Sequence, residues 1–212
     1  MRIGFRRVRR TGLGAAAALL LAAGAVVGLA SPASANIPAN CGPWSGLAVP
    51  AGYTLYDFSA SAVAIGTLAV PYQVPLVANV IVAGSNLNDV IVGTALDDII
   101  CGLAGADVIE GGAGDDELYG GADSDILSGQ ENSDFVSGGP GDDYLYGDQP
   151  VPTVFDTGDT LQGGDDADHL YGGAFPDTLR GGTGGNDNDF VDGGPSMNDT
   201  CREYEQAPAN CP

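Results

Sequence analysis

The chain has 212 residues, of which 28 are acidic, 7 are basic and 34 are glycine, and its formal net charge is −21. Nucleic acids and anionic membrane surfaces repel so negative a chain, which excludes them as partners and favours cations. The glycine content argues against a conventional packed core, and this composition would indicate disorder unless the sequence carries a regular order.

Residues 1–35 are typical of a cleaved secretory signal. Five arginines precede an apolar run over 13–30, and the small residues 33–35 close the segment. An N-terminal membrane anchor is the alternative, and Arg9-Arg10 leaves the choice between the general and the twin-arginine export route open. Cleavage predicts a secreted, extracellular protein that has no further contact with the membrane.

The segment that follows, residues 36–83, is apolar, punctuated by prolines and in part typical of strands. We expect it to form a small N-terminal β cap over the open edge of the structure behind it. A small separate binding element is the alternative. A mature chain would carry two arginines, Arg180 and Arg202, against 28 acidic residues.

Residues 84–194 divide into blocks of nine, with two longer blocks at 147–162 and 181–192 that hold seven and three extra residues. Position one of the blocks is glycine and position eight is a branched aliphatic residue. Three columns that stay in phase over this length predict a repeat architecture. The aspartates at position six are Asp89, Asp98, Asp107, Asp116, Asp125, Asp134, Asp143, Asp159, Asp168, Asp177 and Asp189.

Blocks such as GLAGADVIE, GGAGDDELY and GGPGDDYLY resemble the GGxGxDxUx nonapeptide of RTX, or hemolysin-type, calcium-binding proteins. The resemblance covers about half of the chain. It implies an all-β fold, a parallel β-roll or β-solenoid, with several Ca²⁺ ions as cofactors.

Within a block, the first six residues suit a turn and the last three a short strand. Position eight should face the interior. Because one short strand cannot bury its aliphatic residue alone, successive blocks should alternate between two sheets, giving about six coils of 18 residues. Stacking then places the position-six aspartates in two rows. Carboxylates about 5 Å apart repel by about 3 kcal/mol per pair, so the stack should require calcium between its turns.

The candidate calcium ligands are position-six carboxylates and glycines or turn residues near them. The aspartates are Asp89, Asp98, Asp107, Asp116, Asp125, Asp134, Asp143, Asp168 and Asp177. The position-one glycines are Gly102, Gly111, Gly120, Gly138 and Gly163. Position four contributes Gly105, Gly114, Gly141, Asp123 and Asp166, because glycine and aspartate tolerate positive φ, as does Asn132.

Position four also indicates which turns differ. Leu87, Leu96 and Phe175 stand there in three blocks, and we expect those turns to be distorted or empty. The strongest predicted sites lie between the turns of Asp107 and Asp125, Asp116 and Asp134, Asp125 and Asp143, and Asp143 and Asp168. The last site requires the insertion at 147–162 to bulge outward without breaking the stack.

Four cysteines suggest two disulfides in an exported protein, and three pairings are open. Loop length favours Cys201 with Cys211, which leaves Cys41 for Cys101. Residues 195–212 would then form a C-terminal cap closed by a disulfide.

No catalytic constellation emerges from the sequence. His169 is the one histidine, so there is no HExxH zinc site, and no Gly-x-Ser-x-Gly occurs. We therefore expect a monomeric, extracellular calcium-binding β-roll without enzyme activity. The alternative is a calcium-dependent adhesin that binds a glycan or a cell surface through an outward face bearing Tyr119, Tyr146 and Tyr171 at position nine.

Overall fold

The structure, a computed structural model, describes residues 41–50, 53–57, 72–73, 79–148, 158–182, 188–196, 198–203 and 210–211. The expected signal at 1–35 lies outside these residues, as do parts of both insertions. Across the described ranges, no helix is long and apolar enough to cross a membrane.

The residues described here form two parallel sheets and one 3-10 helix, η1 (Gly42–Trp44). The eight-stranded sheet contains, in spatial order, β1 (Thr54–Asp57), β3 (Val80–Ala83), β5 (Ile99–Ala104), β7 (Glu117–Ala122), β9 (Phe135–Pro140), β11 (Thr160–Asp165), β13 (Thr178–Gly182) and β15 (Thr200–Arg202). The seven-stranded sheet contains β2 (Tyr72–Gln73), β4 (Val90–Val92), β6 (Val108–Ala113), β8 (Ile126–Glu131), β10 (Tyr144–Asp148), β12 (His169–Tyr171) and β14 (Phe190–Asp192).

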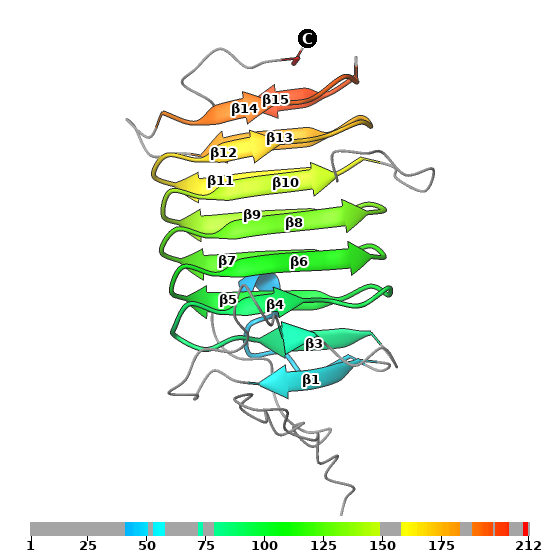
Figure 1. Cartoon of the computed structure of the whole chain (residues 1–212), viewed down its shortest axis with the longest axis vertical. Helices are drawn as coiled ribbons and strands as arrows, with labels where there is room; N and C mark the ends of the chain where they lie inside the picture. Colours follow the sequence, from blue (N-terminus) through cyan, green and yellow to red (C-terminus); the bar gives the residue numbers. More distant parts are fainter. Residues whose placement is uncertain are drawn as a thin grey trace, which may run out of the picture.

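From β3 onward the chain passes from one sheet to the other with each strand, so each strand pairs with the strand two places later (Figure 1). Leu118, for example, lies between Ile100 and Val136 in neighbouring coils, 18 residues away on each side. The predicted all-β parallel roll of about six coils is confirmed. The stack continues across both insertions, since β9 still pairs with β11 and β12 with β14.

The strands are longer than the sequence predicts. β5 to β9 and β11 each span six residues, because positions one to three of the next block continue the strand. The reason is that these glycine-rich positions keep pairing with the neighbouring coil, as Leu103 does with Gly121 and Gly112 with Gln130. Only positions four to six remain for the turn.

The core is a single column of aliphatic side chains between the two sheets. Every position-eight residue is 0 or 1% exposed, which confirms that this position faces the interior. One apolar side chain per strand is a small contribution to stability, at most about 2 to 3 kcal/mol each. The column comprises Ile91, Ile100, Ile109, Leu118, Leu127, Val136, Leu145, Leu161, Leu170, Leu179 and Val191.

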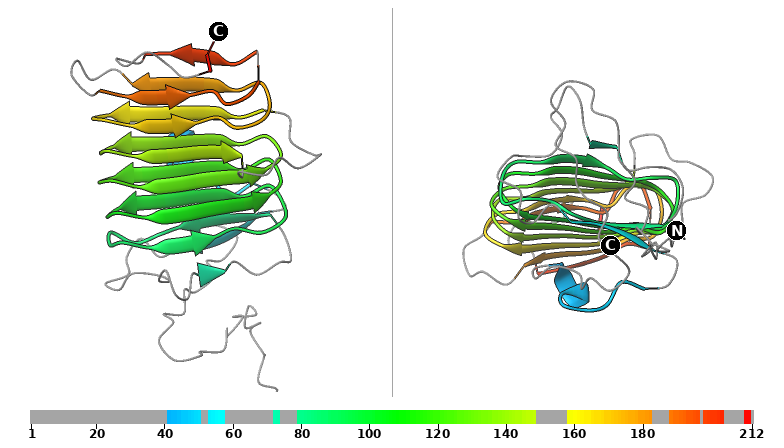
Figure 2. Two further views of the ribbon diagram at one scale, coloured as in Figure 1. Left: turned by 45° about the horizontal axis from the view of Figure 1, so that its top comes forward. Right: turned by 90° about the horizontal axis from the view of Figure 1, so that it is seen from below.

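A second apolar cluster lies on the outer face of the eight-stranded sheet. The segment around Cys41 covers this face, and η1 sits outside the roll (Figure 2). Tyr119 belongs to the cluster and is 8% exposed. The expectation that Tyr119 shares an outward surface with Tyr146 and Tyr171 is therefore wrong: the latter two lie on the other sheet, because successive blocks alternate between sheets.

The N-terminal strands continue the coil geometry upstream of Gly84. In β3, Val82 lies beside Ile100 and is buried in the core, so it occupies the place of a position-eight residue. Val80 then stands where a block would carry its aspartate, and its backbone N–H donates to Asp98 Oδ1 at 3.0 Å. β3 thus follows the backbone of the repeat without its carboxylate.

Two disulfides fasten the ends of the roll. Cys41 is joined to Cys101 in β5, with the Cα atoms 5.4 Å apart. Cys201 in β15 is joined to Cys211, with the Cα atoms 6.0 Å apart, and both residues pack against the last part of the core. These are the two pairs that loop length favours.

Candidate functional site

The position-six aspartates form two continuous rows, one at each edge of the roll. Within a row, the backbone N–H of each aspartate donates to Oδ1 of the aspartate one coil later, at 2.7 to 3.0 Å. All of these side chains are between 0 and 5% exposed. One row is Asp89, Asp107, Asp125, Asp143, Asp168 and Asp189. The other is Asp98, Asp116, Asp134, Asp159, Asp177 and Asp199.

The second carboxylate oxygen points back toward the position-one glycine of its own block. A Cβ added to Gly120 would meet both Asp125 Oδ2 and the carbonyl oxygen of Gly138 in the next coil. The same arrangement recurs at Gly102 with Asp107 and the Gly120 carbonyl. Position one must therefore be glycine, and at Gly102 and Gly120 a backbone carbonyl oxygen of the next coil adjoins the same space as Oδ2.

Several of these Oδ2 atoms are buried and, among the described residues, accept no hydrogen bond. They belong to Asp107, Asp116, Asp125, Asp143, Asp168 and Asp199. A buried carboxylate oxygen without a donor is costly, because it has lost its water and gained nothing in return. Oxygen atoms that are grouped in this way, without donors, fit a hard cation.

Burial raises the pKa of the central aspartates well above the usual value near 4. The pKa of Asp116 rises to about 9, and that of Asp107 and of Asp168 to about 8. Asp125 and Asp143 rise to about 7. The backbone hydrogen bond to each carboxylate opposes the shift, and nearby carboxylates add to it. The site therefore disfavours negative charge unless a proton or another cation accompanies it.

Six turns share one backbone conformation, and we call them the open turns. Positions two and four both have positive φ in each, including non-glycine residues such as Leu103 (88°) and Asp123 (78°). This agrees with the expectation that position four needs a residue that tolerates positive φ. The open turns are those that lead to Asp107, Asp116, Asp125, Asp134, Asp143 and Asp168.

The first two turns of the repeat, which lead to Asp89 and Asp98, differ, and we call them the closed turns. Their position-two residues, Ser85 and Thr94, donate their backbone N–H to Asp89 Oδ2 at 2.6 Å and to Asp98 Oδ2 at 2.7 Å. The Ser85 hydroxyl also lies 3.0 Å from Asp89 Oδ2. Both oxygens of each predicted ligand thus already have donors from the chain.

The leucines at position four complete this difference. Leu87 and Leu96 are 42% exposed and do not take up positive φ. Their backbone N–H groups donate to Ser85 Oγ and Thr94 Oγ1. The predicted distortion of the two turns is confirmed, and its cause is the hydroxyl residue at position two together with leucine at position four.

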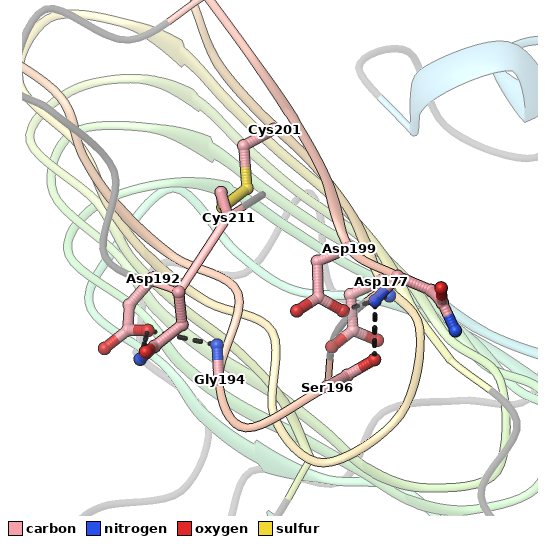
Figure 3. The surroundings of a disulfide bond; sticks show 9 residues. Asp177, Asp192, Gly194, Ser196, Asp199, Cys201 and Cys211 are labelled. Carbon is pink, nitrogen blue, oxygen red and sulfur yellow. Dashed lines mark hydrogen bonds between the residues drawn. A yellow bond between two sulfur atoms is a disulfide. The ribbon is translucent and has the colours of Figure 1, made fainter.

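One further member of the rows and a set of position-five acceptor side chains were not predicted from the sequence. Asp199 takes the place of a position-six residue in the block that starts at Gly193. One extra residue in this block shifts it out of the nine-residue register. Figure 3 shows Asp199 beside Asp177 and the Cys201–Cys211 disulfide. Position-five side chains also accept hydrogen bonds from backbone N–H groups of neighbouring coils. The signal in the sequence was an Asp or Asn that recurs directly before the position-six aspartate. These acceptors are Asn88, Asp97, Asp115 and Asp142.

Neighbouring turns in a row bring two position-six carboxylates together, not three. Among the residues that the structure describes, no group of three histidine, cysteine, aspartate or glutamate side chains is placed to hold a metal ion. A cation between the turns would therefore take the rest of its ligands from backbone carbonyls.

A comparison with protein families gives a match to the model described as RTX calcium-binding nonapeptide repeat. It matches in four copies, at residues 83–118, 92–127, 119–149 and 162–195. All open turns and both closed turns lie within these ranges. A comparison with curated proteins gives no match.

Proposed function

Because the repeat region of this chain belongs to the RTX calcium-binding nonapeptide repeat family, we propose that the protein is a secreted β-roll that folds when Ca²⁺ binds between its open turns. Family and fold together make it a calcium-binding β-roll protein. The location of the sites, the dependence of folding on calcium and the export of the chain are the parts that we propose.

The buried Oδ2 atoms without donors carry this proposal. Neighbouring carboxylates in a row repel by about 3 kcal/mol per pair at a separation near 5 Å. Several such pairs exceed the 5 to 15 kcal/mol that stabilises an ordinary domain, and the thin aliphatic column adds little. Bound calcium would supply two positive charges where the carboxylates accumulate.

We place the sites between consecutive open turns of one row. The pairs are Asp107 with Asp125, Asp125 with Asp143, Asp143 with Asp168, and Asp116 with Asp134. Carboxylate and carbonyl oxygens on a flexible turn suit calcium better than magnesium, which demands a tighter octahedral geometry.

The closed turns are weaker candidates, because Asp89 and Asp98 already accept hydrogen bonds from the backbone N–H groups of Ser85 and Thr94. Asp177 lies in a block whose position four is Phe175, which does not adopt positive φ. We therefore propose that the ions concentrate in the middle of the roll, between Asp107 and Asp168.

Export is supported by the two disulfides, which form and persist in oxidising compartments. Calcium outside the cell is millimolar, a range in which extracellular modules bind. A role without catalysis is supported by the position of His169, which stacks on Tyr144 on the outside of the sheet with ring centroids 4.6 Å apart.

The experiment is a calcium titration of the exported protein, starting in chelator, followed by far-UV circular dichroism and by calorimetry. We expect strand signal to rise cooperatively between about 0.1 and 1 mM calcium, with several ions bound per chain. Magnesium at the same concentrations serves as the control and should leave the spectrum unchanged. Full strand content in chelator at about pH 9, where the carboxylates of the rows are ionised, or no calcium uptake, would refute the proposal.

A further inference from the structure

A groove of about 770 Å³ lies over the outer face of the seven-stranded sheet, and none of the position-six aspartates lines it. Its lining includes Glu110, Ser128, Tyr146, Asp148, Tyr171 and Asp192. This volume is within the range of small-molecule sites. None of the described residues that line it is basic, so three carboxylates face it without a compensating charge.

The groove exists because the outward position-nine column changes character from strand to strand. Along the sheet the column runs Glu110, Ser128, Tyr146, Tyr171 and Asp192. The Tyr146 and Tyr171 rings stack on each other, with centroids 5.1 Å apart and planes within 7°. The other side of Tyr146 faces the strand of Ser128, whose small side chain leaves room.

The size of this gap follows from the strand spacing. Glu110 and Tyr146 lie two strands apart, which is about 9.6 Å in a β-sheet. A flat or linear group can therefore lie over Ser128, with the Tyr146 ring on one side and the Glu110 carboxylate on the other. Cations bind favourably against tyrosine rings, most of all where a carboxylate is near.

Asp148 supplies a second and independent sign of a ligand. It lines the groove and is 8% exposed. The backbone N–H of Ala174 donates to its Oδ2, whereas its buried Oδ1 has no hydrogen-bond partner among the described residues. An oxygen that is fixed in place and lacks a donor requires a ligand that can donate a hydrogen bond.

Asp192 at the far end is already held in place. Its Oδ1 accepts hydrogen bonds from Gly194 N–H at 3.0 Å and from Asn210 Nδ2 at 2.8 Å. Asp192 therefore contributes negative charge, and Asp148 contributes a buried acceptor oxygen that lacks a donor among the described residues. We propose that this groove binds a protonated alkylamine, whose ammonium group donates to Asp148 while its chain lies along Tyr146.

The requirement for a donor sets the ligand class apart from its nearest alternatives. A quaternary ammonium could lie against Tyr146 but has no N–H for Asp148. A neutral diol of the same length could donate to Asp148 but would gain nothing from the carboxylates. A neutral oligosaccharide could stack on the tyrosines but would leave the negative charge of the groove unbalanced.

The test is calorimetry with 1,5-diaminopentane on the calcium-saturated protein in about 150 mM salt, where weak charge effects are screened. We expect saturable binding of one molecule per chain. Tetramethylammonium, 1,5-pentanediol and a neutral glucan oligosaccharide should each bind at least about tenfold more weakly.

Matched variants separate this site from the general negative charge of the chain. Asp148→Asn should weaken diamine binding at least about tenfold, because it removes the charge and disturbs the acceptor. Asp165→Asn removes the same charge from an exposed position outside the groove and should change binding less than about twofold. Equal effects of the two variants would overturn the proposal.

A further variant tests the groove without changing Asp148, because the substitution of that buried residue could itself impair folding. Ser128→Phe fills the gap beside Tyr146 and leaves every charge in place, so it should abolish diamine binding while the calcium titration stays unchanged. Retention of binding in this variant, or tighter binding of the glucan than of the diamine, would also overturn the proposal.

Discussion

The closed turns at the start of the repeat and the open turns in its middle follow the same nine-residue pattern and place their aspartates in the same rows. They differ in how the second carboxylate oxygen is satisfied. In the closed turns, Ser85 and Thr94 donate to it. In most of the open turns it has no donor among the described residues. Two positions per block, the second and the fourth, thus decide whether a turn is complete by itself or needs an ion.

The largest expected effect is that acid replaces calcium in the open turns. Burial raises the pKa values of five of their aspartates, Asp107, Asp116, Asp125, Asp143 and Asp168, to between about 7 and about 9 in the folded chain. Because the raised pKa means that the folded state binds more protons, these groups stabilise the metal-free roll fully below about pH 4. That stability is lost as the pH rises through 7 to 9.

In chelator, we therefore expect the strand signal in circular dichroism to return as the pH falls from 9 to about 4. The same titration with calcium present should show weaker calcium binding at lower pH, since protons compete for the same oxygens. A metal-free chain that stays unfolded at pH 4.5 would contradict this account of the rows.

Next in size is the loss of one shared carboxylate. Asp125→Asn removes a ligand that we assign to two sites, so calorimetry should count one or two fewer ions. Stability at saturating calcium should fall by about 2 to 4 kcal/mol. The matched Asp98→Asn lies in a closed turn, and the number of bound ions should stay the same. Equal losses in both variants would mean that the two kinds of turn do not differ in function.

A smaller effect is expected when a closed turn is converted into an open one. The double substitution Thr94→Gly and Leu96→Gly removes the hydroxyl and the leucine that hold the turn leading to Asp98. Glycine lets both positions adopt positive φ. We expect one additional ion per chain, between Asp98 and Asp116, measured by calorimetry. An unchanged ion count would show that other features also separate the two kinds of turn.

The smallest effect concerns the hydroxyl of a closed turn. Ser85→Ala leaves Asp89 with fewer donors and should lower the free energy of unfolding, measured in calcium, by about 1 to 2 kcal/mol. Ser124→Ala, at an exposed position of an open turn, should change it by less than about 0.5 kcal/mol. A similar loss of stability from both substitutions would argue against the conclusion that the closed turns satisfy their carboxylates without an ion.

The repeat predicted most of the fold, because three columns of residue types fix the alternation between sheets. Glycine at position one, aspartate at six and an aliphatic residue at eight each meet one geometric requirement that recurs in every coil. The packing of η1 over Tyr119 could not be predicted, because the N-terminal segment does not repeat and contacts residues far away in the sequence. Asp199 was missed because a single inserted residue breaks the register.

The site was predictable to a similar degree. The rows and the special backbone of position four follow from residue types. That Ser85 and Thr94 would satisfy their aspartates did not follow, since it depends on the direction of a single N–H group. The groove beside Tyr146 was also beyond the pattern, because it arises from differences between blocks and not from what they share.

The tight contact at each position-one glycine implies an unusual tolerance to change. Seven residues inserted between β10 and β11, and three between β13 and β14, leave the pairing of the coils intact. A single methyl group at Gly120 would instead collide with a carboxylate and with the backbone of the next coil. During evolution, such a molecule can acquire whole loops along its edges more readily than it can accept one extra carbon atom at a position-one glycine. Those edges are also where a foreign peptide could be grafted.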